Sequence, residues 1–164
     1  MANKLYYAPE TALDWTDDTT GGDYTLDLGG LAADGVRAGD VGDLGTGSNS
    51  LWYRWTFVVD GFDTAPVVGE SVHLFLAWSD GTYIAGDLSG TDAASSTVVI
   101  PNLQPLGAAV VQTTTAANEL MVHGVCKIAT RYVIPVVWNN TADALLSTSD
   151  AHHVILTPIP PELQ

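Results

Sequence analysis

The sequence predicts an all-β protein, an antiparallel β-sandwich of jelly-roll type with an extended N-terminal arm. Short stretches of the chain repeatedly alternate apolar and polar residues, as strands with one buried face do. The 16 glycines and 8 prolines separate these stretches at near-regular spacing, and no stretch has the length of a long helix. About eight short strands separated by turns are typical of a two-layer sandwich. A chain of 164 residues suits one core, so we expect an arm over residues 1–22 and a single domain over residues 23–164.

The first 50 residues are predicted to form the arm and loops. They contain many Gly-Asp pairs and one short alternating piece, Tyr24–Leu28, that could form a strand. Such a segment buries too little apolar surface to order itself. We therefore expect it to lie along the main domain or against a neighbouring molecule.

Regular strand patterns begin at Leu51. Residues 51–60 and 71–79 alternate apolar and polar side chains, and Asp80-Gly81 predicts a turn into a hairpin partner over residues 82–85. Three further elements follow, namely a polar loop at Leu88–Ser96, a short strand at Thr97–Ile100 stopped by Pro101, and an apolar strand at Leu106–Val111.

The last third of the chain is the densest in strand patterns. Three strands are predicted, at Asn118–Ala129, Thr130–Asn140 and His152–Pro160, with one helical turn between the last two at Ala142–Leu146. Pro135 lies inside the second of these strands, and proline cannot donate a ladder hydrogen bond. We therefore expect that strand to lie at an edge or to carry a bulge.

Charge excludes one class of partner. The chain has 19 Asp and Glu against 5 Lys and Arg, a net charge of -14, which repels phosphate backbones. We therefore expect no nucleic-acid partner. Nine acids lie in the first 43 residues, and they favour a solvated, solubilising surface over a basic partner: Glu10, Asp14, Asp17, Asp18, Asp23, Asp27, Asp34, Asp40 and Asp43.

No targeting segment is visible. The N-terminal residues contain no apolar run long enough for a signal peptide, and nowhere do 18 apolar residues follow one another. We expect synthesis in a cytoplasm and no membrane partner. Cys126 is the one cysteine, so it cannot form an internal disulfide, and its apolar neighbours indicate a small core residue.

Reactive side chains do not form a recognisable motif. His152 and His153 are adjacent, so on a strand they point to opposite faces, and His73 and His123 stand alone on other strands. The acids near glycines supply oxygen ligands without the spacing of an EF-hand loop. Neither a Gly-x-Ser-x-Gly elbow nor a phosphate loop is present. We expect no catalytic residue, no metal and no cofactor, and hence no enzyme.

The aromatic residues are the better candidates for recognition. Trp52 lies on the opposite strand face to Trp55, so interface and core are equal alternatives for it. Large aromatic side chains in an otherwise polar arm are expected to dock somewhere. The candidate interface residues are Tyr6, Tyr7, Trp15 and Trp52.

The order of several segments resembles small virion structural proteins of tailed bacteriophages. The resemblance spans about residues 51–158, and its pieces are Ala-Trp-Ser-Asp-Gly-Thr-Tyr (77–83), Gly-Thr-Asp-Ala-Ala (90–94), Pro-Asn-Leu-Gln-Pro-Leu-Gly (101–107), Arg-Tyr-Val-Ile-Pro-Val-Val-Trp-Asn-Asn-Thr-Ala-Asp-Ala-Leu (131–145) and His-His-Val-Ile-Leu-Thr-Pro (152–158). It implies a non-enzymatic capsid decoration, or cement, protein on the virion surface, made in the host cytoplasm. Its expected partners are the major capsid protein and further copies of itself in a trimer.

Two other functions remain open from the sequence. The first is a tail-associated structural protein, because the resemblance does not separate head from tail. The second is a carbohydrate-binding module that would stack a sugar on Trp52 or Tyr83 and use loop acids for hydroxyl groups or calcium.

Overall fold

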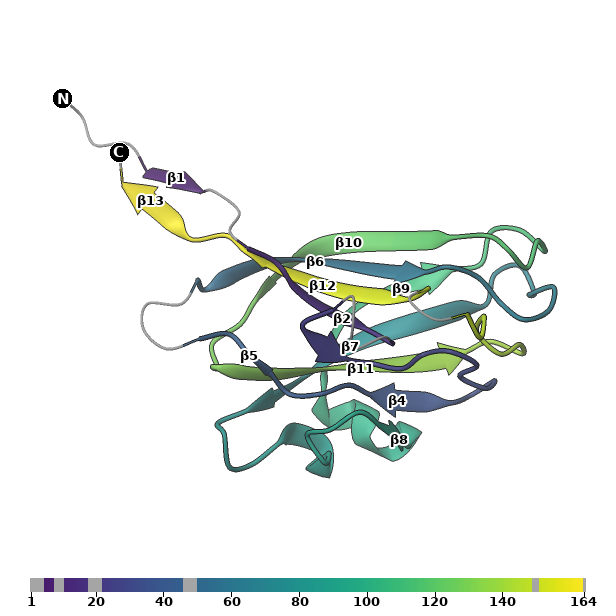
Figure 1. The fold of residues 1–164 in the computed structure, drawn as a ribbon, viewed down its shortest axis with the longest axis horizontal. Coiled ribbons are helices and arrows are strands. Elements are labelled where there is room, and N and C mark those ends of the chain that lie inside the picture. Colours follow the sequence, from purple (N-terminus) through teal and green to yellow (C-terminus); the bar gives the residue numbers. More distant parts are fainter. Residues whose placement is uncertain (1–4, 8–10, 18–21, 46–49, 149–150, 164) are drawn as a thin grey trace.

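Two β-sheets face each other and enclose the main hydrophobic core (Figure 1). The computed structural model describes the chain except for residues 1–4, 8–10, 18–21, 46–49, 149–150 and 164. In spatial order, the first sheet contains β10 (Leu120–Lys127), β6 (Trp52–Val59), β12 (His153–Pro158), β2 (Leu13–Thr16) and β3 (Tyr24–Thr25). The second sheet contains β8 (Ala93–Ser95), β4 (Val36–Ala38), β11 (Tyr132–Asn140), β7 (Ser71–Ser79) and β9 (Gln104–Val110), and β5 (Gly42–Asp43) also pairs with β11.

The strand order is that of a jelly roll, as the sequence predicts. β7 pairs with β9, β6 with β10, β4 with β11 and β2 with β12, so early strands pair with late ones in nested order. All four of these pairs are antiparallel, and among the described strand pairs β2 and β3 alone run parallel. Nested antiparallel pairing folds one long ribbon into two facing sheets.

Buried and exposed side chains alternate along the strands, and the buried ones form the main core. On β6, the side chains of Tyr53, Trp55 and Phe57 are buried, while the residues between them point outward. The ring of Trp55 lies against Gly107 of β9 and Gly124 of β10, where an added Cβ would come within 2.6 and 2.7 Å of it. These two glycines therefore make room for one large ring where the sheets meet.

A second, smaller core covers the outer face of the second sheet. Phe75, Ala77, Ile134 and Val136 point away from the main core and pack under residues 84–103. That segment contains β8 and two short 3-10 helices, η1 (Ala85–Asp87) and η2 (Thr97–Asn102). The second sheet is thus covered on both faces by the chain itself.

Two predicted strands of this segment differ in the structure. The predicted strand at 97–100 is part of η2, because Ser96 caps it by accepting a hydrogen bond from the backbone N–H of Val98 at 3.4 Å. The predicted hairpin partner at 82–85 is reduced to one bridge between Ser79 and Ile84. Asp80 instead accepts hydrogen bonds from the N–H groups of Thr82 and Tyr83, both at 2.8 Å, which closes a tight turn.

The N-terminal region is more ordered than predicted, and the expected arm over residues 1–22 is corrected. β2 is a strand of the first sheet, and Trp15 on it is fully buried, with its indole N–H donated to the carbonyl of Asp40 at 2.9 Å. Leu26 and Leu28 are also buried in the main core. The sandwich therefore begins before residue 23, because a few well-spaced apolar residues suffice to anchor this segment.

The part of the N-terminus that does leave the sandwich is short. β1 (Leu5–Tyr7) pairs antiparallel with β13 (Pro161–Leu163), in register from Leu5 opposite Leu163. Figure 1 shows this two-stranded ribbon projecting from the body. We call it the terminal ribbon.

Pro135 lies in a central strand, in regular register opposite Leu76 of β7, so the expectation of an edge strand is corrected. β11 pairs with β7 on one side and with β4 and β5 on the other. The N–H of Gly39 donates to the carbonyl of Pro135 at 2.9 Å, in the interval between β4 and β5. The missing proline N–H therefore falls where the neighbouring ladder is already interrupted.

Candidate functional site

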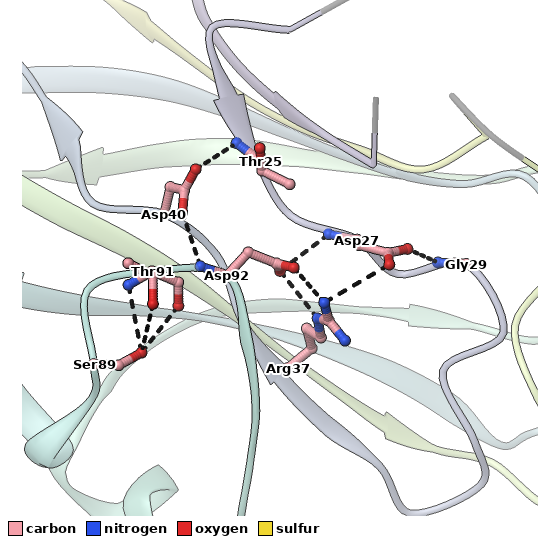
Figure 2. Close-up of polar contacts among 8 residues, drawn as sticks. All are labelled: Thr25, Asp27, Gly29, Arg37, Asp40, Ser89, Thr91 and Asp92. Carbon is pink, nitrogen blue, oxygen red and sulfur yellow. Dashed lines mark hydrogen bonds and ion pairs between the residues drawn. The ribbon is translucent and has the colours of Figure 1, made fainter. Parts of the chain in front are cut away.

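A polar cluster around Arg37 joins three segments of the chain (Figure 2). The carboxylate of Asp92 accepts hydrogen bonds from Arg37, at 3.0 Å from Nε and a shorter one from the neighbouring amino group, and from the backbone N–H of Asp27 at 3.1 Å. Asp40 accepts from the N–H groups of Asp92 at 2.8 Å and Thr25 at 3.2 Å. The cluster thus connects the 84–103 segment to β4 and to the strands before it.

This cluster is a structural clamp. The hydrogen bond that Arg37 donates to Asp92 raises the pKa of Arg37, and the nearby charge of Asp27, at 3.7 Å, adds to the effect. The carboxylates of Asp92 and Asp40 are both engaged with donors of the chain itself. Each of these carboxylates accepts hydrogen bonds from residues far away in the sequence, so the two carboxylates hold the fold together.

Two polar residues at the end of β11, Asn139 and Thr141, also stabilise the fold. The amide of Asn139, fully buried, donates to the carbonyls of Leu31, Ala32 and Asp143 at 2.8–3.1 Å, and its oxygen accepts from the hydroxyl of Thr141 at 2.7 Å. These bonds satisfy buried groups that would otherwise destabilise the fold. Asn139 and Thr141 therefore fix the turn that follows β11 through internal hydrogen bonds.

His152 is a further buried polar residue with a defined protonation state. Its Nδ1 lies 3.2 Å from the backbone N–H of Asp60 and accepts that hydrogen bond, so Nε2 carries the proton and donates to the carbonyl of Leu146 at 2.9 Å. Burial lowers its pKa, which keeps the ring neutral. His152 is therefore engaged inside the fold on both ring nitrogens.

The described residues provide neither a cluster of metal ligands nor an activated cysteine nucleophile. Within them, no three His, Cys, Asp or Glu side chains are placed to hold one metal ion. Burial raises the pKa of the Cys126 thiol to about 11, so the reactive thiolate form is suppressed. In the part of the chain that the structure describes, no helix is both long and apolar enough to cross a membrane.

The structure describes the side chains of two of the four predicted interface residues, Trp15 and Trp52. Trp15 is buried in the core, so its assignment as a surface anchor is corrected. Tyr6 and Tyr7 lie on β1, opposite Glu162 and Pro161, and their side chains are outside the described part of the structure. Trp52 points outward from β6 and is 44% exposed. Its interface role stays a prediction.

Trp52 belongs to a larger exposed surface on the outer side of the first sheet. We call this surface the β10–β6 face, and its exposed side chains are Trp52, Arg54, Met121, His123, Val125 and Lys127. Cross-strand pairing places Lys127 beside Trp52, Val125 beside Arg54 and Met121 beside Val58. Met121 is 59% exposed and Val125 is 61% exposed. Apolar side chains thus alternate with cationic ones across two neighbouring strands.

Two cations of the face, Arg54 and Lys127, differ from the other described cations in their ion pairing. Arg37 pairs with Asp92, and Arg131 pairs with Asp43, whose pKa this hydrogen-bonded pair lowers to about 2. Arg54 and Lys127 form no ion pair with a described carboxylate. A strongly acidic chain therefore carries a locally cationic and apolar surface.

A groove continues this face around the edge of the sandwich. It lies between the edge strands β9 and β10, encloses about 230 Å³ and is lined by Ala109, Val110, Gln112, Asn118, Glu119, Leu120, Met121 and Val122. Val110 on its other wall is 47% exposed. Sequence alternation assigns Met121 and Val125 to the outward side of their strand, but it does not reveal that this side is uncovered.

Comparisons with known proteins assign neither a family nor a function to this chain. No protein-family model matches the chain, and no curated protein matches it. A solved structure titled "Crystal structure of murine APRIL at pH 5.0" is similar over 94% of this chain and 96% of that one, at 12% sequence identity and a TM-score of 0.41. The fold assignment rests on the strand order given above.

Proposed function

We propose that this protein is a non-enzymatic virion structural protein that binds the outer surface of a tailed-phage head as a decoration, or cement, protein. The ordered segments over residues 51–158 support this proposal by resemblance. The observation that carries it is the terminal ribbon, which holds β1 away from the sandwich in a position to reach another molecule (Figure 1). A rigid body with a projecting strand pair is suited to attachment at a surface.

The proposed partners are the major capsid protein and other copies of this chain in a trimer. Tyr6 and Tyr7 on the ribbon supply aromatic groups of the kind that anchor interfaces. The net charge of -14 keeps the exposed surface hydrated and away from packaged nucleic acid. The sandwich then forms the outward body, and the ribbon makes the contact with the shell.

The test is binding of the purified protein to heads assembled without it. A variant that lacks residues 1–10 loses β1 but keeps β2 and the buried Trp15, so the sandwich should remain intact. We expect at least a tenfold loss of co-sedimentation with the heads, with an unchanged circular dichroism spectrum. Equal binding of the shortened and full chains would remove the ribbon from the mechanism, and no binding of the full chain would reject the head location.

Tail attachment is the alternative within the same class. A map of the virion distinguishes the two, because copies spread over the head lattice support decoration and copies on the tail support a tail-associated protein.

Two exposed aromatic side chains favour carbohydrate binding as a second candidate function. Trp52 is 44% and Tyr83 is 77% exposed, and exposed aromatic faces can stack on sugar rings. A glycan array tests this function with the full chain and a Trp52→Ala, Tyr83→Ala double variant. No binder on the array, with no thermal shift on adding calcium or EDTA, would reject it.

A further inference from the structure

We propose that the β10–β6 face is the surface through which copies of this chain bind one another, in a head-to-tail ring. This inference rests on the homo-oligomer named in the proposed function and assigns its interface. The occupant of the face is a second copy of this chain, which presents an acidic part of its surface to the face.

The first argument is the apolar surface that the face leaves in contact with water. Trp52, Met121 and Val125 lie on two adjacent strands, and the groove beside β9 extends this surface through Val110. Among the described strands, β10 is also at the edge of its sheet, so its outer backbone groups pair with no other described strand. An apolar edge strand of eight residues promotes association, and folded proteins cover such edges.

The second argument is charge complementarity. Two copies that each carry a net charge of -14 repel one another over most orientations. Arg54 and Lys127 lie on the face with no carboxylate partner among the described residues. None of the six residues of the face is acidic, while Glu119 lines the groove beside it. This surface therefore attracts the acidic remainder of another copy.

The distribution of charge favours a head-to-tail contact over a two-fold contact between copies. In a two-fold contact the face would meet itself, and its cations would gain no opposite charge. In a head-to-tail contact the face meets a different, acidic surface of the next copy, and such contacts form a ring when the rotation between successive copies closes. A three-membered ring agrees with the trimer in the proposed function.

The experiment measures the molar mass of the full chain by light scattering and sedimentation over a range of concentrations. We expect the wild-type chain to form a discrete oligomer that weakens as salt is raised. Val125→Asp places an acid in the face and should raise the dissociation constant at least tenfold. Val125→Thr keeps a β-branched side chain and should weaken association by a smaller factor, which separates interface effects from misfolding.

A matched control uses the same change on the opposite side of the sandwich. Val98 of η2 is 80% exposed, and Val98→Asp should leave the molar mass unchanged. A wild-type monomer at all concentrations, or an unchanged mass for Val125→Asp, would overturn the proposal. If Val125→Asp keeps its mass but no longer binds heads, the face contacts the shell and self-association through it is rejected. A ring that Val125→Asp dissociates but that never binds heads would keep this interface and reject the decoration function.

Discussion

The outer faces of the two sheets carry similar side chains but are covered differently. The second sheet directs Phe75, Ala77, Ile134 and Val136 outward, and residues 84–103 cover them as a second core. The first sheet directs Trp52, Met121 and Val125 outward, and those side chains remain exposed. Apolar residues on an outer strand face thus have two different roles within one chain.

This difference shows how to recognise an interaction surface in a protein with no catalytic motif. A covered outer face contributes to folding stability, so its substitutions should act on unfolding. An uncovered outer face contributes little to folding, so its substitutions should act on association. The following predictions test this separation, from the largest expected effect to the smallest.

Truncation of Phe75 should produce the largest loss of stability. Phe75→Ala leaves a cavity in the second core, and such changes cost about 3 to 5 kcal/mol. Met121→Ala is the matched change on the β10–β6 face, where the side chain is 59% exposed, and it should cost under about 1 kcal/mol. Urea unfolding of the two variants checks both values, and equal losses would mean that the β10–β6 face is as important for folding as the covered one.

Loss of the clamp should have the next largest effect. Asp92→Ala removes an acceptor of Arg37 and of the N–H of Asp27. Losing hydrogen bonds to a charged group costs roughly 1.5 to 3 kcal/mol, and Arg37 keeps Asp27 at 3.7 Å as a second carboxylate. We expect a loss of about 2 kcal/mol and faster proteolysis within residues 84–103. Asp43→Ala removes the exposed pair with Arg131 and should leave both properties almost unchanged.

The sequence allowed the second half of the sandwich to be predicted well and the first half poorly. The strands around Val122, Val136 and Val154 follow a period of two with clear turns between them, and the structure confirms them. Trp15 and Leu26 are isolated in polar, glycine-rich sequence, and only tertiary packing shows that they enter the core. Local pattern predicts strands but not which distant segments cover them.

For the candidate site, too, the sequence predicts the local strand faces but not which of them are covered by other segments. Alternation predicts that Trp52 lies opposite Trp55, and the structure places it outward. The exposure of Val125 depends on whether another segment crosses that sheet, which no local pattern encodes. The clamp between Arg37 and Asp92, 55 positions apart, is equally invisible to local patterns.

Acidification should destabilise the fold through its buried histidine. The pKa of His152 is lowered in the folded state, so the unfolded chain takes up this proton first as the pH falls below about 6.5. Its contribution to stability is complete above that pH and is lost as pH falls toward the folded pKa. His73, whose pKa burial also lowers, acts in the same direction. Thermal unfolding between pH 7.5 and 5 measures the change.

A pair of variants assigns that pH dependence. His152→Gln should flatten the pH dependence of the melting temperature, although the variant is less stable at every pH. His123→Gln, on the exposed β10–β6 face, should keep the wild-type profile. If the melting temperature of His152→Gln still falls steeply with decreasing pH, groups other than His152 cause the acid sensitivity.

Removal of a cation from the β10–β6 face should have the smallest effect on folding. Arg54 forms no ion pair with a described carboxylate, so Arg54→Ala should change the free energy of unfolding by under about 0.5 kcal/mol. Chemical denaturation measures it beside Asp92→Ala. A loss as large as that of the clamp variant would show that the face is tied into the fold.

The nested strand order also has a consequence for folding kinetics. The sequence separation of paired strands grows from β7 with β9, through β6 with β10 and β4 with β11, to β2 with β12 and finally β1 with β13. Strand pairs with a short sequence separation close at lower entropic cost. The sandwich should therefore assemble from β7 and β9 outward to β2 and β12. The terminal ribbon then closes last and opens first, which leaves β1 free to exchange into a neighbouring molecule while the sandwich stays folded.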